Sequence, residues 1–231
     1  MQPIGELSTK IAEWARRCAA RAETPEFKAN AAKLAEQTAD FEAASRETER
    51  KLALVEAGIP QALWETLRAP TETPALSAVR EWIAGPPACV FLALAGQAGR
   101  GKTFAAAWAI SERGGRYALA HDLVSVGTFD PVWRDLAAAP LVALDELGSE
   151  YRNDAYAASL YTLLNTRHAH QRRTILATNL DAPAFVARYC PDAADPLRDR
   201  LRTASRWVNL SGESMRRHWT ETADREPGED G

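Results

Sequence analysis

The feature that most constrains the fold of this 231-residue chain is a glycine-rich run that fits GxxxxGK[ST] at every fixed position, Gly96-Gln97-Ala98-Gly99-Arg100-Gly101-Lys102-Thr103. The apolar segment 90–95 leads into this run, and the helix-favouring segment 104–110 follows it. A strand, a glycine-rich loop and a helix in that order make a phosphate-binding loop, because backbone N–H groups converge on anionic oxygens at the positive end of the helix.

Two side chains at the end of the loop extend this interpretation to a metal-bound nucleotide. Lys102 is expected to supply a cation for the β- and γ-phosphates, and the Thr103 hydroxyl to bind Mg²⁺. The alternative is a glycine-rich turn followed by a surface lysine, but the flanking strand and helix favour the phosphate loop. The sequence therefore predicts a single site for ATP and Mg²⁺.

A second apolar strand, 141–144, ends in two carboxylates, Asp145 and Glu146. Ligands of open parallel sheets bind at the carboxyl ends of the strands, so this pair is expected to face the same crevice as the phosphate loop. Asp145 is then predicted to hold Mg²⁺, and Glu146 to act as the general base for an attacking water. An acidic pair after a strand is also a common solvated start of a loop, but the phosphate loop upstream favours the functional interpretation.

Polar residues farther along the chain leave alternatives open. Asn179 follows the apolar strand 174–178, where its amide would bind water or the γ-phosphate, or would simply cap a turn. Three arginines within 198–202 include Arg200, and Arg216 follows later. An arginine beside the γ-phosphate would stabilise the transition state, whereas a solvated basic helix paired with neighbouring aspartates explains the same composition.

The alternation of apolar runs with amphipathic segments predicts an α/β domain whose parallel sheet is covered on both sides. The expected strands are 89–95, 116–120, 141–145, 174–178 and 207–210, and the expected helices include 75–82, 103–112 and 154–170. Residues 1–56 are rich in Ala, Glu, Lys and Arg and predict a helical arm of about two helices broken near Thr24-Pro25. The expected organisation is a helical arm at 1–56, an ATPase domain at 57–219 and a disordered acidic tail at 220–231.

Composition excludes several other classes of protein. A net charge of −3 argues against a wholesale nucleic-acid binder, so any DNA contact must come from a local basic patch. The three cysteines form no CxxC pair, which argues against a disulfide framework or a zinc site and fits a reducing compartment. The longest apolar stretch, 88–95, is far too short to cross a bilayer. We expect a cytoplasmic protein with no membrane segment.

The ordered series of motifs resembles the AAA+ ATPases of the DnaC helicase-loader group and the similar IstB transposition ATPases. The resemblance covers about residues 52–217, and beyond the phosphate loop it rests on AGIP at 57–60, ALAHDL at 118–123, LDELGSEY at 144–151, NTR at 165–167, ATN at 177–179, LRDRL at 197–201 and GESMR at 212–216. It implies a five-stranded parallel sheet of order 5-1-4-3-2. It also implies that Asn179 is the sensor 1 residue, that Arg200 is an arginine finger offered to a neighbouring subunit, and that Arg216 is the closing sensor arginine.

The same resemblance implies partners. An ATP-dependent homo-oligomer is expected to grip single-stranded DNA and, as a loader, to dock onto a replicative hexameric helicase through its N-terminal segment. The IstB alternative would have a transposase as its partner. A third hypothesis is a scaffold that binds ATP and hardly hydrolyses it, but Glu146 and Arg200 argue against this, because a pure binder needs neither.

The chain departs from the pattern of that group in three places. Arg100 puts a cation inside the phosphate loop where a small residue is common, and it would either add a phosphate contact or simply point outward. The second acid is Glu146 rather than Asp. No cysteine-rich zinc module precedes the ATPase segment, so the arm 1–56 stands in its place as the expected docking element. The basic residues Arg167, Arg172 and Arg173 are candidate DNA contacts.

Overall fold

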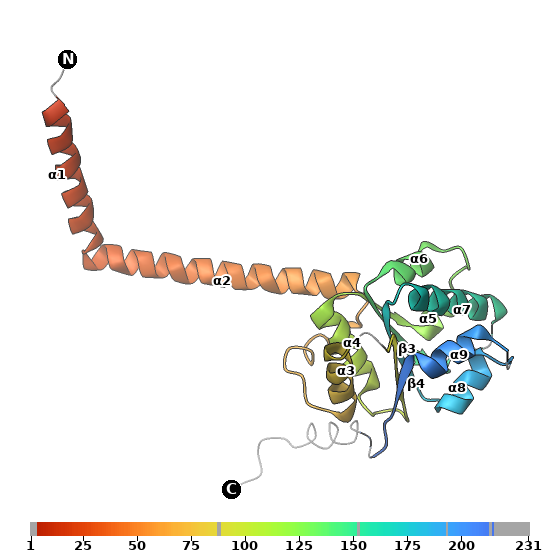
Figure 1. The fold of residues 1–231 in the computed structure, drawn as a ribbon. Coiled ribbons are helices and arrows are strands. Elements are labelled where there is room, and N and C mark those ends of the chain that lie inside the picture. The colour runs from red at the N-terminus through yellow and green to blue at the C-terminus, as the bar shows by residue number, and fades with distance from the viewer. Residues whose placement is uncertain (1–3, 87–88, 152, 193, 213, 215–231) are drawn as a thin grey trace, which may run out of the picture. The chain divides into compact units, whose positions relative to one another are not determined.

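The computed structural model describes residues 4–86, 89–151, 153–192, 194–212 and 214, and the internal contacts of the chain divide it into two units that meet between Leu52 and Ala53. In the first unit, α1 (Ile4–Ala22) is followed by α2 (Pro25–Glu56), which runs on into the second (Figure 1). Thr24 separates the helices, because its hydroxyl accepts a hydrogen bond from the Phe27 N–H at 3.3 Å and Pro25 starts the new helix. The predicted break near Thr24-Pro25 is confirmed. Within the described residues, no helix is both long and apolar enough to cross a membrane.

The second unit is built on a five-stranded sheet in which every paired strand is parallel to its neighbour. The strands are β1 (Phe91–Ala95), β2 (Arg116–Leu119), β3 (Leu141–Leu147), β4 (Arg173–Thr178) and β5 (Ser205–Asn209). Their order across the sheet is β2-β3-β4-β1-β5, which is the predicted order 5-1-4-3-2 read from the other edge. All five predicted strands are therefore confirmed, with modest shifts at their ends.

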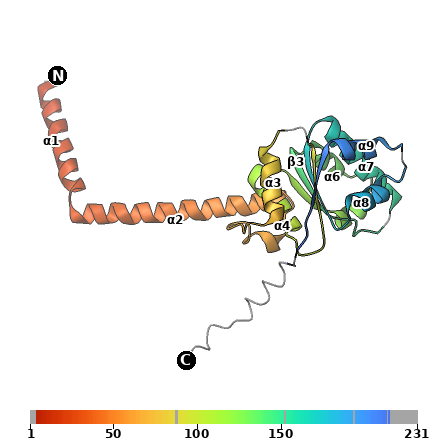
Figure 2. The same cartoon turned by 60° about the horizontal axis from the view of Figure 1, so that its bottom comes forward.

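Helices cover both faces of this sheet, as Figures 1 and 2 show. One face carries α3 (Pro74–Ala84) and α4 (Lys102–Arg113), and the other carries α5 (Ala120–Val124), α6 (Pro131–Ala138), α7 (Asp154–Ala169), α8 (Ala182–Tyr189) and α9 (Pro196–Thr203). Successive residues of β1 point to opposite faces of the sheet. Phe91 belongs to the hydrophobic core beneath α5 to α9, whereas Leu92 belongs to the core beneath α3 and α4. Because both faces are covered, the central strands β1, β3 and β4 consist largely of continuous apolar runs, whereas the edge strands β2 and β5 are only partly buried.

The central strand β3 contains an irregularity at its carboxyl end. Leu144 pairs with Leu176 of β4, whereas Leu147 pairs with Thr178, so three steps along β3 match two along β4. One extra residue in β3 makes a β-bulge, which bends a strand and changes the direction of its side chains. The bulge holds Asp145 and Glu146, and it explains why β3 continues to Leu147 rather than ending at Asp145 as predicted.

Candidate nucleotide-binding site

The glycine-rich loop connects the end of β1 to the start of α4. Its first residue, Gly96, donates its N–H to the Thr178 carbonyl of β4 at 3.2 Å. Its last glycine, Gly101, has the left-handed φ of 78° and precedes α4, and no side chain caps the first turn of that helix. The N–H groups of this turn therefore point toward the loop as hydrogen-bond donors at the positive end of the helix.

Lys102 is the residue through which the loop and the neighbouring strand meet. Its side chain is largely buried, with 8% of the residue exposed. The amino group donates to the carbonyl oxygens of Gly96 and, at 2.9 Å, Gln97, and also to Oδ1 of Asn179 at 2.9 Å. Two residues predicted from separate motifs, Lys102 and Asn179, are thus brought into direct contact.

Two glycines of the loop lie against the segment that follows β5. A Cβ at Gly96 would lie 2.4 Å from the carbonyl oxygen of Leu210, and a Cβ at Gly99 would lie 2.1 Å from Oγ of Ser214. A backbone oxygen blocks a side chain at Gly96, and the left-handed φ of 79° disfavours one at Gly99, so both positions favour glycine. Ser214 of the GESMR motif therefore lies beside the phosphate loop, whereas Arg216 itself lies outside the described residues.

Arg100 supplies the clearest indication of what the loop would bind. Its Nε and Nη1 atoms are buried, and no hydrogen-bond acceptor among the described residues serves them. A buried charged donor without an acceptor is costly, and a phosphate oxygen is a strong acceptor for a guanidinium group. Together with Lys102 and the uncapped start of α4, Arg100 gives a set of donors that fits a polyphosphate.

Asp145 lies almost completely buried on the bulge, with 1% of the residue exposed. Its Oδ2 accepts a hydrogen bond from the Tyr117 hydroxyl at 2.5 Å, and its Oδ1 accepts one from the N–H of Glu146 at 2.8 Å. Burial, and then the negative charge of Asp145, raise the pKa of the Tyr117 hydroxyl well above its usual value. Tyr117 therefore stays protonated and holds the Asp145 carboxylate in one orientation.

Glu146 has the opposite environment from its neighbour. Its φ of 59° is left-handed, which is unusual for a residue with a Cβ, and half of its side chain is exposed. Its Oε2 lies 3.3 Å from Nδ1 of His121, in the helix that follows β2. The bulge thus gives the two acids different surroundings. The Asp145 side chain is buried, whereas the Glu146 side chain is half exposed at the carboxyl end of the strand.

Sequence reasoning missed Tyr117 and His121 as neighbours of the acidic pair. Leu119 pairs with Asp145 in the register of β2 and β3, so His121 lies just beyond the same edge of the sheet. The rule that parallel strands end at a common edge would have indicated His121. No comparable pattern marks Tyr117, since a tyrosine in a strand is ordinarily a packing residue.

The remaining predicted ligand and finger residues are distributed as follows. Thr103 lies partly exposed in the first turn of α4, where its hydroxyl and the Asp145 carboxylate are the groups that would hold Mg²⁺. Arg200 lies on α9, on the face of the sheet opposite α4, and its guanidinium group donates to Oδ1 of Asn165 in α7. Within one chain, Arg200 is therefore engaged with α7 and not with the phosphate loop.

The prediction that Arg167 contacts DNA is wrong, because this side chain is fully buried, with 0% exposed. It donates to Oγ1 of Thr174 at 2.7 Å and to the carbonyl oxygens of Leu136, Ala139 and Arg173 at 2.6, 2.7 and 2.6 Å. Burial, and then the charge of Arg172, lower the pKa of the Arg167 guanidinium to about 10, which leaves it charged at neutral pH.

The two arginines that follow along the chain are also used by the backbone. Arg173 donates to the carbonyl oxygens of Trp82, Ile83 and Gly85 at 2.7–2.8 Å, at the end of α3, and Arg172 donates to the carbonyl of Ala137. Carbonyl groups at a helix end lack partners within the helix, and Arg173 supplies them. Both guanidinium groups thus serve the fold, which leaves fewer of their donors for a phosphate backbone.

No family model and no curated protein sequence matches this chain. Several solved structures are similar to it. The DnaC helicase loader is 17% identical, with a TM-score of 0.53, over 66% of this chain and 100% of that chain. DnaI is 18% identical, with a TM-score of 0.51, over 65% of this chain and 92% of that chain. The replication initiator DnaA bound to AMPPCP and single-stranded DNA is 17% identical, with a TM-score of 0.54, over 74% of this chain.

This chain spans 58% of the DnaA chain and 53% of the chain of a DNA replication initiation factor to which it is also similar. The second unit of this protein therefore has a fold similar to that of the DnaC helicase loader, a five-stranded parallel sheet with helices on both faces.

Proposed function

We propose that this protein is a cytoplasmic ATPase that binds ATP and Mg²⁺ at the loop 96–103. The observation that carries the proposal is the contact between the Lys102 amino group and Oδ1 of Asn179, which joins the phosphate loop to the next strand end. Lys102 and Arg100 would bind phosphate oxygens, and Thr103 and Asp145 would hold the metal ion.

The catalytic roles follow from the two environments of the acidic pair. Bound Mg²⁺ would neutralise charge on the phosphates. The Glu146 carboxylate, at the edge of the sheet, would accept a proton from the attacking water, while the Asn179 amide would orient that water or the terminal phosphate. Asp145 would stay in place through its bond from Tyr117.

Calorimetric titration of the purified chain with ATP, with and without Mg²⁺, tests this function. We expect binding that depends on Mg²⁺ in the unaltered protein and none in Lys102→Ala, whereas Lys33→Ala on the exposed surface of α2 should bind like the unaltered protein. If the unaltered protein showed no affinity for adenine nucleotides linked to Mg²⁺, the proposal would be wrong.

We further propose that the ATPase acts as a helicase loader in DNA replication. Similarity to the DnaC helicase loader over the whole of that chain supports this, as does the order of the sequence motifs. In this proposal ATP promotes a homo-oligomer in which Arg200 reaches the site of a neighbouring subunit, and the oligomer engages single-stranded DNA and a replicative hexameric helicase. A transposase as partner is the alternative.

The exposed apolar side chains of α2 support docking through the arm. Phe27, Leu34 and Phe41 follow one another at intervals of seven residues and are 47%, 64% and 75% exposed. A seven-residue spacing places them on one stripe of the helix, which is the pattern that packs against another helix. When each protein is immobilised, the full chain should retain the purified helicase, and a variant with all three residues changed to Ser should retain less of it. Retention of the transposase instead would support the alternative.

A further inference from the structure

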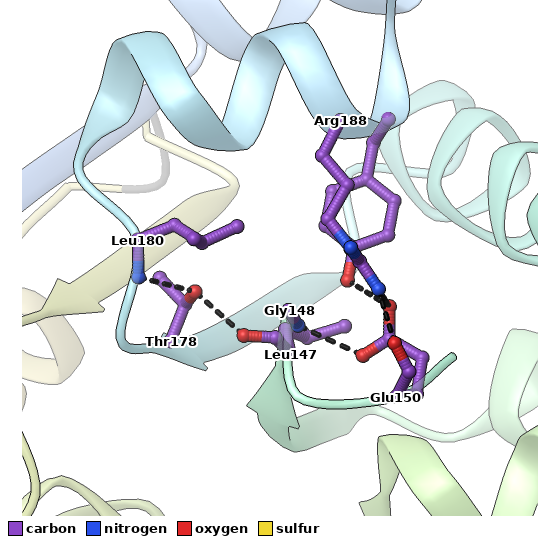
Figure 3. Close-up of polar contacts among 7 residues, drawn as sticks. Leu147, Gly148, Glu150, Thr178, Leu180 and Arg188 are labelled. Atoms are coloured by element: carbon purple, nitrogen blue, oxygen red, sulfur yellow. Dashed lines mark hydrogen bonds and ion pairs between the residues drawn. The ribbon is translucent and has the colours of Figure 1, made fainter. Parts of the chain in front are cut away.

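A buried carboxylate lies just beyond the candidate catalytic acids, in the segment that follows β3. Glu150 has a side chain that is only 2% exposed. Its Oε2 accepts the N–H of Gly148 at 2.8 Å, and its Oε1 accepts Nε and Nη2 of Arg188 at 3.2 and 3.0 Å and the hydroxyl of Tyr189 at 2.6 Å (Figure 3). A carboxylate at this depth is stable only when such donors surround it.

These donors come from two elements that are distant in sequence. Gly148 belongs to the exit of β3, whereas Arg188 and Tyr189 are the last residues of α8. The Arg188 guanidinium also donates to the backbone carbonyl of Glu150. Because both oxygens of one carboxylate are used, Glu150 fixes the distance between the segment after the acidic pair and the helix that follows Asn179.

A second set of contacts joins the exits of β3 and β4. The Thr178 hydroxyl donates to the Leu147 carbonyl at 2.7 Å and accepts the N–H of Leu180 at 3.0 Å (Figure 3). A Cβ at Gly148 would lie 2.7 Å from Cδ1 of Leu180, so the two segments touch closely. Asn179 is held between Thr178 and Leu180, beside the residues that Glu150 restrains.

The backbone of Glu146 needs such support. Its left-handed φ of 59° costs about 1–2 kcal/mol for a residue with a Cβ, and surroundings that fix the backbone are what maintain such a conformation. The Ser149 N–H closes a turn onto the Glu146 carbonyl at 3.1 Å, and Gly148 within this turn is bound to Glu150. The restraint on Gly148 therefore acts on the residue that presents the candidate general base.

We propose that Glu150 is a positioning residue for ATP hydrolysis. By binding Gly148 and the end of α8 together, it holds Glu146 and Asn179 in the relative placement that the reaction requires. This inference rests on the proposed ATPase function and deepens it. Glu150 is a positioning residue and not a catalytic one, because it touches neither nucleotide nor water in the proposed mechanism.

The test is Glu150→Gln, which keeps the size of the side chain but replaces one acceptor oxygen by a donor facing Gly148 or Arg188. We expect kcat to fall about tenfold or more, because small misplacement of reacting groups costs as much as 10²-fold. The dissociation constant of a fluorescent ATP analogue should stay within about twofold, since the phosphate loop is untouched. Glu81→Gln removes an exposed ion pair with Arg206 and should change neither quantity.

A double mutant separates positioning from general damage. Because Glu150 acts in part through Glu146, Glu150→Gln should slow the Glu146→Gln protein less than it slows the unaltered protein, and equal losses in both backgrounds would contradict a role in placing Glu146. A folded Glu150→Gln protein with unchanged kcat would overturn the inference. Parallel losses of kcat, nucleotide affinity and thermal stability would overturn it as well, because they would indicate a merely structural role.

Two milder variants keep the test decisive if Glu150→Gln fails to fold. Tyr189→Phe removes one hydrogen bond to Glu150, and Arg188→Lys removes the paired donors. Both should lower kcat by severalfold at constant nucleotide affinity, and full activity in both would refute the inference. If the unaltered chain neither binds nor hydrolyses ATP, the proposed function itself fails, which is a different result from an active chain that is indifferent to these changes.

Discussion

Replacement of Arg167 by lysine distinguishes a structural arginine from a DNA contact. The charge is kept, so a residue that only neutralised phosphate would tolerate the change. In the structure, three nitrogens of the guanidinium group serve five acceptors: the Thr174 hydroxyl, the carbonyls of Leu136, Ala139 and Arg173 and, at 3.5 Å, the carbonyl of Ala137. A lysine has a single nitrogen, which reaches only part of this set.

The magnitude follows from the acceptors that lose their partner. With at least two buried oxygens left without a donor, at about 1–3 kcal/mol each, we expect Arg167→Lys to lower the free energy of unfolding by about 4 kcal/mol. For a domain of this size that corresponds to a fall of about 8–16 °C in the thermal midpoint. Urea unfolding followed by tryptophan fluorescence would measure the change.

The matched control is Arg116→Lys, at an exposed arginine whose guanidinium donates only to the neighbouring Gly115 carbonyl, at 3.3 Å, in the part of the chain that the structure describes. Its stability should remain within about 0.5 kcal/mol of the unaltered protein. If Arg167→Lys were equally stable, the account of Arg167 as a buried anchor for the backbone would be refuted.

Four further outcomes are expected. Glu146→Gln should keep its affinity for ATP but lose about 10²-fold or more in phosphate release, and retained turnover would exclude Glu146 as the general base. Arg200→Ala should leave ATP affinity unchanged and abolish the rise in specific activity with protein concentration, whereas a persisting rise would contradict a role in a neighbouring subunit. Cys190 is fully buried and burial raises the pKa of its thiol to about 12, so mass spectrometry should find alkylation at exposed Cys18 in the native protein and at Cys190 only after denaturation. Burial, and then Arg200, lower the pKa of His168; its protonation therefore opposes folding, and the thermal midpoint should fall as the pH drops below about 6.5, less steeply in His168→Gln.

The sequence was sufficient to predict the sheet and the loop. Apolar runs without alternation identified the three central strands, because a strand buried on both faces needs no polar side, and shorter apolar segments identified the two edge strands. The fixed glycines of the loop were informative because their backbone conformations and close approaches exclude other residues, as the contacts of Gly96 and Gly99 show. The order of the strands came from the resemblance, since local patterns carry no information on which strands are neighbours.

Other features depend on contacts between distant segments and could not be predicted. Arg167 was expected to be exposed because charged side chains usually are, and its acceptors come from the end of α6 and from β4. The bond from Tyr117 to Asp145 likewise joins residues of two different strands. Sequence patterns report the chemistry of a residue and its local spacing, but not the backbone groups that other segments bring to it.

The extra residue in β3 has a consequence for how this protein tolerates changes in length. Only Asp145 and Glu146 lie between Leu144 and Leu147, so deleting either acid would also let the ladder with β4 run without interruption. Every later side chain of the strand would then point to the opposite face of the sheet, so the remaining acid would not keep its present surroundings. The different tasks proposed for two adjacent carboxylates thus depend on a count of residues as much as on their identity, and deleting either acid should be more harmful than replacing it by its amide.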